Sequence, residues 1–453
     1  MKKLILLLLN FLFLLLCCSG CGSGSMPNAK KPVTLTMWHV YGSQTKSPLN
    51  DAIDEFNTIV GKEQGIVVNV VSVTSSSAID EALASSANNE PGAEELPDLF
   101  TAYPRVAQIV GKEKLLSWNH YFSEEELQEF NEAFLSEGYF EEELLMLPIA
   151  KSTEAFFLNK TLFDKFSKNT GASLDELKTF DGLFQTANRY YDWSGGHYFM
   201  QINDYYHYAL TGMKAYGSEF IKNGELQLQE PAFEKVWEPL ARAAIYGGIC
   251  LDDGYAASRW KTVEIISNIG STADVLYQPN MVIYPDNTTE DISTLTLPYP
   301  LFTEDQAGVI HRGGGLFALK SDDDKKNQAA VIFAKWLTEK EHNLDFTTQT
   351  GYLPVTKDAF DLLFDNLDMV EDENYRNLYT MVNHMLENYE FHTIPLFDNA
   401  SKVQHSFEAN VKTILKTAHL HYKNQAALAE DSGALLDELV KSSLEELKLL
   451  TLN

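Results

Sequence analysis

Three ring side chains follow the first strand-like segment of the chain, in the stretch TLTMWHVYG. Trp38, His39 and Tyr41 could stack on a ligand, take part in proton transfer, or pack in the core. Indole and phenol rings offer an apolar plane with a hydrogen-bonding tip, whereas an imidazole can donate or accept a proton. The elements that position these rings narrow the choice.

Strand-like and helix-like segments alternate around the rings. The apolar or β-branched runs that predict strands are Val33–Met37, Ile66–Val73 and Leu96–Ala102. Ser47 and Pro48 begin a predicted helix with proline in its first turn, and Ala78–Ser86 is helical in pattern. The order β-α-β-α-β predicts a parallel sheet covered by helices, which is an α/β fold.

The carboxyl ends of these strands are the expected place for a ligand. Trp38 and His39 lie at the end of the first predicted strand, and Tyr103 follows the third. We therefore expect these side chains at one edge of a ligand site. Packing at the end of the sheet is the alternative for Trp38, and a structural role is the alternative for His39.

The later part of the chain mixes the same two patterns. Its predicted strands and helices are Ile265–Ile269, the segment after the glycine turn in His311–Lys320, Asn327–Lys340 and Leu435–Leu450. The acidic stretch Leu115–Leu145 is predicted to be a mostly helical, solvated surface. Further ring side chains either pack or face a ligand: Tyr205, Tyr206, His207, Trp193 and Trp260.

The first residues of the chain are typical of a targeting segment, which takes no part in the fold. Two lysines precede the apolar run Leu4–Leu16, which is shorter than the ~20 residues of a membrane-spanning helix. The Ser-Gly-Cys sequence that ends at Cys21 resembles a bacterial lipobox. This resemblance implies cleavage before Cys21 and a lipid on its sulfur. Lipidation at Cys18 and an ordinary secretory signal are the alternatives.

Composition and charge exclude several classes of function. A hydrophobic content of 45% over 453 residues indicates a folded chain too long for one ordinary core, so two lobes are expected. The net charge of −29 argues against nucleic-acid binding and against a charge-based hold on anionic lipids. Cys250 is the only cysteine beyond the leader, and we expect it to be a small buried hydrophobe.

Sequence motifs of common enzymes and metal sites are absent or incomplete. The chain lacks HExxH, the P-loop and the G-x-S-x-G motif. Gly313–Ala318 matches a dinucleotide fingerprint only formally, because a strand rather than a helix is predicted after it. Asp252-Asp253-Gly254 lacks the other ligands of a calcium loop. We therefore expect no cofactor and no metal, and no pair of carboxylates stands out as a glycosidase pair.

Several segments, taken in order, resemble a known family. After the lipobox they are TMWH, PDLF, LPIAKSTEAFFLNKTLFDKF, SNIGST, GGGLFALK, FAKWLTEKE and TQTGYLPVTKDAF. Over roughly Val33 to Phe360 this series resembles the family 1 extracellular solute-binding proteins of bacterial ABC importers. That group includes maltose-binding and glycerol-phosphate-binding proteins. Residues 361–453 match only in length and helical character.

The resemblance implies a two-lobe, periplasmic-binding-protein-like α/β fold with a hinge and a ligand cleft between the lobes. The expected division is a signal peptide at 1–20, a tether at 21–32, lobe 1 in 33–149 and 308–358, and lobe 2 in 150–307 and 359–453. The resemblance also implies that the protein catalyses nothing. It would hand its solute to permease subunits at the outer face of the cytoplasmic membrane.

The resemblance also indicates which segments enter the cleft. The candidate ligand-binding residues are Trp38, His39, Tyr41, Tyr103, Ser152, Thr153, Ser271, Gly313, Gly314 and Tyr352. Rings suit the apolar faces of a sugar, hydroxyl and imidazole groups suit its hydroxyls, and the two glycines allow the backbone to approach the ligand. A mere turn of the chain is the alternative for the glycines, and core packing is the alternative for the rings.

A lipid-anchored protein that binds a sugar or oligosaccharide is the function we expect. A glycerol phosphate or another polyol phosphate is the alternative solute, for which Arg312 and Arg259 are the available cations. Two further functions would suit an extracellular chain of this kind, namely a ligand sensor that signals to a membrane receptor and a surface glycosidase.

Overall fold

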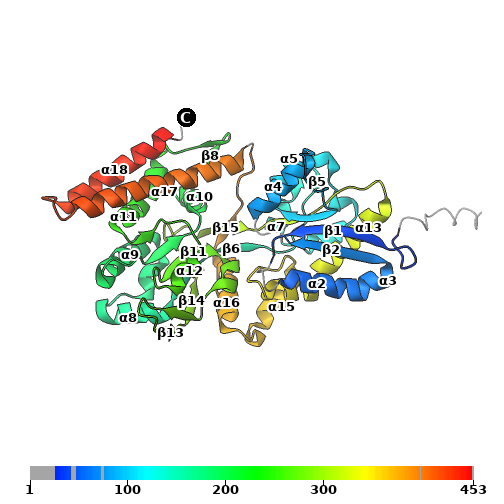
Figure 1. The fold of residues 1–453 in the computed structure, drawn as a ribbon, viewed down its shortest axis with the longest axis horizontal. Helices are drawn as coiled ribbons and strands as arrows, with labels where there is room; N and C mark the ends of the chain where they lie inside the picture. Colours follow the sequence, from blue (N-terminus) through cyan, green and yellow to red (C-terminus); the bar gives the residue numbers. More distant parts are fainter. Residues whose placement is uncertain (1–25, 42–46, 73–75, 398, 451–453) are drawn as a thin grey trace, which may run out of the picture.

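Two α/β lobes lie side by side along the long axis of the molecule (Figure 1). The computed structural model describes residues 26–41, 47–72, 76–397 and 399–450. We call lobe 1 the part built on the sheet of strand order β16-β3-β1-β2, and lobe 2 the part built on the larger sheet. The predicted leader and Cys21 lie outside the described residues.

The sheet of lobe 1 has parallel pairing at its centre. Its strands are β1 (Val33–His39), β2 (Ile66–Ser72), β3 (Leu99–Ala102) and β16 (Gly315–Ala318). Strand β1 pairs in parallel with β2 and with β3, which confirms the predicted β-α-β-α-β order. Strand β16 comes from much later in the chain and pairs with β3 in the antiparallel direction.

Helices pack on both faces of this sheet and beside it. They are α2 (Pro48–Phe56), α3 (Lys62–Gln64), α4 (Ser76–Ala87), α5 (Val106–Val110), α13 (Asp324–Thr338) and α14 (Lys340–Thr348). Helix α15 (Lys357–Asp365) follows α14, and its buried Phe360 and Leu363 join the core of lobe 2. Helix α2 begins where the sequence predicts, because the Ser47 hydroxyl accepts a hydrogen bond from the Asn50 amide. Successive strand side chains face opposite ways. Leu35 and Met37 therefore share a core with α2 and α13, whereas Trp38 packs on the face covered by α4 and α5.

The sheet of lobe 2 has the order β10-β7-β11-β6-β15-β17, with β14 paired to β6. Its strands are β6 (Ser152–Asn159), β7 (Met200–Ile202), β10 (Ile249–Cys250), β11 (Ser267–Ser271), β14 (Thr294–Leu297), β15 (Gly308–Arg312) and β17 (Glu390–His392). Two small hairpins lie outside it: β8 (Ile221–Lys222) with β9 (Glu225–Leu226), and β12 (Met281–Ile283) with β13 (Thr289–Asp291). The predicted strand Ile265–Ile269 is thus confirmed with a shift of two residues.

An aromatic-rich core joins this sheet to its helices. They are α8 (Lys160–Thr170), α9 (Phe180–Ser194), α10 (Tyr205–Ala215), α11 (Pro231–Tyr246), α12 (Ala256–Lys261), α16 (Glu373–Asn388), α17 (Ala400–Gln425) and α18 (Ser432–Leu450). The last two form a hairpin that packs on α11, where Trp237 Nε1 donates to the Ser443 hydroxyl at 3.1 Å. Helix α18 confirms the predicted C-terminal helix.

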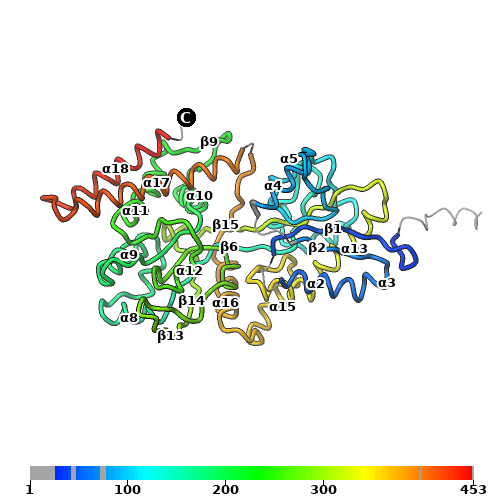
Figure 2. Tube along the Cα trace, viewed as in Figure 1, coloured from blue at the N-terminus to red at the C-terminus, as the bar shows by residue number. Residues whose placement is uncertain are grey.

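Two antiparallel strands connect the lobes. Strands β6 and β15 run through the middle of the molecule, with Arg312 opposite Ser152 and His311 opposite Thr153 (Figure 2). The chain segment before β6 also pairs with the Tyr352 turn, because Leu353 N donates to Lys151 O at 2.6 Å. The residue boundaries proposed for the two lobes stay a prediction.

The stretch Leu115–Leu145 differs from the expectation of a mostly helical surface. Its α-helices are the short segments α6 (Glu124–Gln128) and α7 (Glu132–Ser136), followed by the hairpin β4 (Tyr139–Phe140) and β5 (Glu143–Leu144). A capping box at Ser123 starts α6, but Phe130 then bridges to Thr356 and interrupts the helical pattern. Tertiary pairing therefore overrides local helix propensity here.

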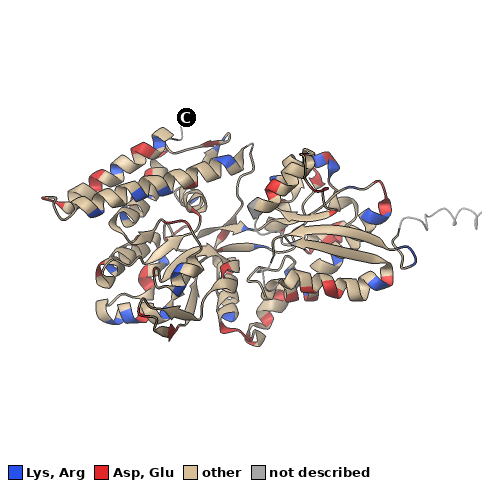
Figure 3. Ribbon diagram, in the orientation of Figure 1, with Lys and Arg blue, Asp and Glu red and all other residues tan. Residues whose placement is uncertain are grey.

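Acidic and basic residues are interspersed along the ribbon of both lobes in Figure 3. The acidic composition argues against nucleic-acid binding, which needs clustered basic residues. None of the helices in the described residues combines the length and the apolar character that crossing a membrane requires.

Candidate functional site

Trp38 and Tyr41 lie on opposite faces of the lobe 1 sheet, although the sequence predicts both at one ligand site. Trp38 is 4% exposed and packs with Phe100 in the core under α4 and α5. Its ring also lines a cavity of about 460 Å³ beside α4 and the loop 90–94. Tyr41 belongs to the other core of lobe 1. Only Tyr41 therefore faces the later segments that were expected to enter the site.

His39 is buried and bonded within lobe 1. Its Nε2 lies 2.7 Å from Asn50 Oδ1, and its Nδ1 accepts a hydrogen bond from the Tyr41 amide at 3.2 Å. Both ring nitrogens are thus engaged if Nε2 carries the proton. Burial lowers the pKa of His39, and the hydrogen bond with Asn50 opposes this shift. This arrangement ties the end of β1 to α2, which is the structural role considered for His39.

Tyrosines from distant segments meet where the lobes adjoin. The rings of Tyr41 and Tyr352 are 5.0 Å apart between centroids, in an edge-to-face arrangement. Burial raises the pKa of Tyr41, and its neighbours Tyr352 and Tyr103 add to the rise. Burial likewise raises the pKa of Tyr352, with Tyr103 and Tyr277 as the next causes. We call Tyr41, Tyr103, Tyr277 and Tyr352 the tyrosine cluster; Tyr103 and Tyr352 are half-buried and Tyr277 is exposed.

The two predicted glycines hold the backbone close to this cluster. Gly313 has a φ of +104°, which favours glycine, and its carbonyl accepts a hydrogen bond from Lys151 Nζ at 2.7 Å. A Cβ on Gly314 would lie 2.2 Å from the carbonyl oxygen of Ala102, at the end of β3. The glycine turn therefore packs directly on the strand that precedes Tyr103.

Two of the three predicted hydroxyl side chains are hydrogen-bonded within the chain, and the third is buried. Thr153 is fully buried and donates from Oγ1 to Ile310 O at 2.9 Å. The Ser271 hydroxyl accepts from the Ala273 amide at 3.2 Å and caps the 3₁₀ helix η5 (Thr272–Tyr277). Ser152 is 3% exposed, opposite Arg312 in the crossing strands. These residues fix the junction of the lobes, and contact with a ligand stays a prediction for them.

A chain of charged side chains lies next to the tyrosine cluster. Arg312 donates to Glu154 Oε1 at 2.8 Å, and the same oxygen lies 2.9 Å from His207 Nδ1. His207 Nδ1 is also 3.3 Å from Asp204 Oδ2. Burial by itself would lower the pKa of Arg312, but Glu154, Tyr103 and further acidic neighbours raise it above its usual value. We call Glu154, Asp204, His207, Asp274 and Arg312 the charged cluster.

Asp274 completes this cluster at η5. Burial raises the pKa of Asp274 to about 7; the charge of Arg312 opposes this rise and that of Glu154 adds to it. Asn203 Nδ2 donates to Asp274 Oδ2 at 2.9 Å. Asp274 is half-buried, so it remains accessible from the side of Tyr277 and Tyr352, whose pKa values it also raises.

Sequence reasoning missed part of this site. The omitted residues are Glu154, Asn203, Asp204, Asp274 and Tyr277. The rule for strand ends could have found Asn203 and Asp204, which follow β7 directly. The rings considered nearby have other environments: Tyr205, Tyr206 and His207 are buried in α10, Trp260 is buried, and Trp193 is 41% exposed.

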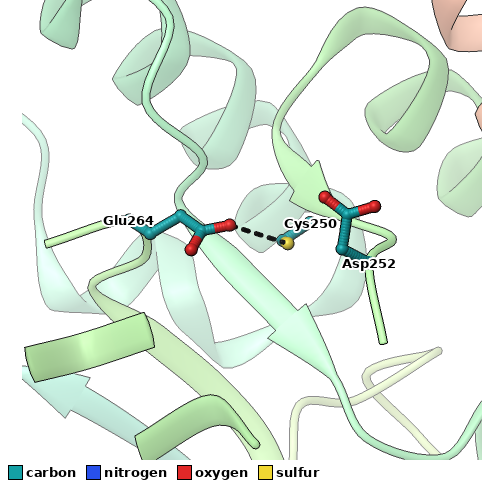
Figure 4. Close-up of side chains that lie close together, drawn as sticks. All are labelled: Cys250, Asp252 and Glu264. Carbon is teal, nitrogen blue, oxygen red and sulfur yellow. Dashed lines mark hydrogen bonds between the residues drawn. The ribbon is translucent and has the colours of Figure 1, made fainter. Parts of the chain in front are cut away.

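One group in lobe 2 has the composition of a metal site, namely Cys250, Asp252 and Glu264 (Figure 4). Their ligand atoms lie within 4.8 Å of one another. However, Arg259 pairs with Glu264, and Lys416 lies 2.7 Å from Asp252. Burial raises the pKa of the Cys250 thiol to about 11. A protonated thiol and two carboxylates that already have cationic partners suit ion pairing better than metal binding.

Comparison with known proteins identifies the class of this two-lobed chain. Residues 51–374 match the model of the bacterial extracellular solute-binding proteins, and the chain belongs to that family. A putative binding protein of Brucella abortus is 26% identical over 257 residues, which cover 55% of this chain and 60% of the relative. The chain thus matches less than two thirds of that relative's length.

Solved structures share the fold at low sequence identity. UgpB from Mycobacterium tuberculosis, in complex with glycerophosphocholine, has a TM-score of 0.67 at 16% identity and covers 92% of this chain and 98% of its own. The cyclic alpha-maltosyl-1,6-maltose binding protein from Arthrobacter globiformis has a TM-score of 0.63 at 16% identity, over 93% and 99% of the two chains. These likenesses confirm the predicted two-lobe fold.

Proposed function

We propose that this protein captures a sugar or oligosaccharide outside the cytoplasmic membrane and delivers it to the permease of an ABC transporter. The observation that carries the proposal is the tyrosine cluster beside the charged cluster, where the two lobes meet. The family supports an extracellular binding role. We infer that the protein binds its solute and does not transform it.

The chemistry of the two clusters suits a sugar. A sugar ring presents apolar C–H faces, which pack on aromatic planes, and hydroxyl groups, which need hydrogen-bond partners. Tyr103, Tyr277 and Tyr352 supply accessible rings, and Asp274 with Asn203 supplies polar atoms. The solute would make its contacts from both lobes, because Tyr103 follows a lobe 1 strand and Tyr277 ends η5 in lobe 2.

The charge balance favours a neutral solute over a polyol phosphate. Two arginines adjoin the tyrosine cluster in the described part of the chain, and both already have acidic partners. Arg105 lies over the Tyr103 ring, 4.9 Å from its centroid, and pairs with Asp80, whereas the guanidinium of Arg312 bonds Glu154. Asp274 and Asp204 add further acidic groups around the same cation. A phosphate would have to compete with Glu154 for Arg312 and would lie beside other carboxylates. The glycerophosphocholine bound by the similar UgpB nevertheless makes polyol phosphates the control ligands of choice.

Attachment and delivery are the remaining parts of the proposal. We infer that a lipid on Cys21 holds the protein at the outer face of the membrane, on the strength of the apolar leader and the Ser-Gly-Cys motif. The family relationship supports delivery to permease subunits, which we propose as the next step. A sensor role would use the same binding event with a different membrane partner.

A thermal-shift screen tests the function directly. Neutral mono- and oligosaccharides, polyols and glycerol phosphates are each added at millimolar concentration. A ligand at 100 times its dissociation constant stabilises the folded state by ~2.7 kcal/mol, which raises the melting temperature measurably. A shift with at least one neutral sugar is expected. If no sugar shifts the melting temperature, carbohydrate binding is refuted.

A further inference from the structure

The Asp274 carboxylate occupies a space that Gly270 leaves open. Gly270 in β11 lies beneath this carboxylate, and a Cβ on Gly270 would lie 2.2 Å from Asp274 Oδ2 and 2.5 Å from Asn203 Nδ2. The φ of Gly270 is outside the left-handed region, so backbone conformation does not require glycine there. The missing side chain makes room for the contact between Asp274 and Asn203.

A relay of amides orients this contact. Gln201 Nε2 donates to Asn203 Oδ1 at 3.1 Å and to Gly254 O at 3.0 Å. The Asn203 amide oxygen is therefore the acceptor in this pair, and its nitrogen donates to Asp274 Oδ2 at 2.9 Å. The Asn203 backbone is anchored as well, because its N–H donates to Ile269 O at 3.0 Å. The carboxylate is thus held in one orientation by Asn203, which follows β7 and is itself fixed by Gln201 of β7 and the backbone of β11.

One carboxylate oxygen is left for another donor. Among the described residues, Asn203 occupies Oδ2 and no group donates to Asp274 Oδ1. Within the described ranges, the charged and titratable groups that face Asp274 are Arg312 from β15, Glu154 from β6, Tyr277 from η5 and Tyr352 from the turn after α14. Arg312 bonds Glu154 rather than Asp274. Asp274 therefore has acceptor capacity that its own chain does not use.

We propose that the Asp274 carboxylate, positioned by Asn203 and Gln201, accepts hydrogen bonds from hydroxyl groups of the solute. A half-buried carboxylate next to exposed Tyr277 suits a sugar with adjacent hydroxyl groups, which can both donate to it. This inference rests on the proposed function, and it assigns a specificity-determining residue to the site. A polyol phosphate gains less here, because its phosphate repels the same carboxylate.

Binding is then linked to pH. Hydroxyl donors prefer the ionised carboxylate, and burial raises the pKa of Asp274 to about 7. Below that pH the carboxyl carries a proton that the solute must displace. We expect the dissociation constant to rise by up to roughly tenfold for each pH unit below about 7, and to change little at higher pH.

Calorimetric titration between pH 5.5 and 8.5 tests the proposal on the full chain. The titrant is the neutral sugar with the largest thermal shift in a panel that includes maltotriose and mannotriose. Asp274→Asn keeps the shape of the side chain but removes its charge, so we expect at least tenfold weaker binding at pH 8 and a flat pH profile. Asp286→Asn, which changes an exposed carboxylate in another turn, should keep the wild-type profile. Asn203→Ala should weaken binding as well, because it releases the Asp274 carboxylate.

The outcomes separate this proposal from the proposed function. Sugar binding by the wild type with no pH dependence, or an Asp274→Asn variant with wild-type affinity and profile, overturns the role of Asp274 alone. No sugar binding at any pH overturns both. If Asp274→Asn fails to fold, the wild-type pH profile together with Asn203→Ala still decides the question.

Discussion

Arg312 and Glu154, from the two strands that connect the lobes, form an ion pair of 2.8 Å between Nη1 and Oε1. Glu154 is 2% exposed and Arg312 is 21% exposed in their side chains, so the pair lies largely out of water. Arg312 is opposite Ser152 in the strand pairing, and Glu154 lies two residues further along the same face of β6. The pair holds together the polypeptide segments between which a solute would be enclosed.

Removing one partner of this pair should destabilise the fold. Arg312→Ala leaves the buried Glu154 carboxylate with His207 as its remaining partner, and such losses typically cost about 3–5 kcal/mol. The double variant Arg312→Ala/Glu154→Gln removes the unpaired charge and should recover part of that free energy. Urea denaturation measures both. An Arg312→Ala variant as stable as the wild type would contradict the importance of the pair.

Truncation of Trp38 should reduce the stability of the protein, whereas truncation of Tyr103 should reduce its affinity for the sugar. Trp38 is 4% exposed in the core of lobe 1, so Trp38→Ala should reduce the free energy of unfolding by about 3–5 kcal/mol. Tyr103 is half-buried in the tyrosine cluster, so Tyr103→Ala should weaken sugar binding by ~1–2 kcal/mol with a small effect on stability. Denaturation and calorimetry on the two variants separate the effects. If Trp38→Ala lost affinity at full stability, the ligand contact predicted from the sequence would be correct instead.

Gly314 should tolerate no side chain. The Cβ of Gly314→Ala would lie 2.2 Å from Ala102 O, so the turn must move away from β3 at a cost of roughly 1–3 kcal/mol. Gly171→Ala is the contrasting control: its φ of +74° favours glycine, unlike the φ of Gly314, and nothing lies within 4 Å of the added Cβ. Its loss of stability should be about 1 kcal/mol. Thermal denaturation measures both variants, and a Gly314→Ala variant as stable as the wild type would mean that close packing at Gly314 is unimportant.

His311 should make the protein less stable in acid. Burial, together with the charges of Lys151 and His392, lowers the pKa of His311 to about 3. The folded state therefore keeps this imidazole neutral, whereas the unfolded chain takes up a proton below the usual pKa of about 6.5. The stability contribution is complete above a pH of about 6.5 and is lost as pH falls toward 3.

The measurement is the free energy of unfolding at pH 7 and pH 5. Wild type should lose more stability over this range than His311→Gln, by up to roughly 1.4 kcal/mol per pH unit. His197→Gln, at an exposed site, serves as the control and should behave like the wild type. Identical slopes for all three proteins would show that His311 does not titrate in this way.

Local patterns predicted much of the fold. The β-branched run of β2, the Ser47-Pro48 start of α2 and the periodicity of α13 depend on neighbours in the sequence, and all three elements formed where expected. The stretch that contains α6 and α7 was harder, because Phe130 pairs with Thr356 far along the chain. No local pattern reveals such a contact.

In the candidate site, too, the sequence predicted the local features but not the contacts between distant segments. Strand ends and the family resemblance pointed to Tyr103, Tyr352 and the glycine turn, and the structure brings these together near Tyr41. The partner of Arg312 could not be read from the sequence, because Glu154 is 158 residues away. The space for the Asp274 carboxylate could not be read from the sequence either, because it depends on the contact between Gly270 and Asn203, which lie in separate segments of the chain.

Calorimetric titration with a neutral oligosaccharide at low and high salt tests the central claim most directly. Capture of a neutral sugar predicts saturable binding with one dissociation constant that barely changes with ionic strength, because no net charge is bound. Glycerol phosphate should bind weakly or not at all at either salt concentration. Binding of glycerol phosphate alone, tightening strongly as salt is lowered, would contradict the account.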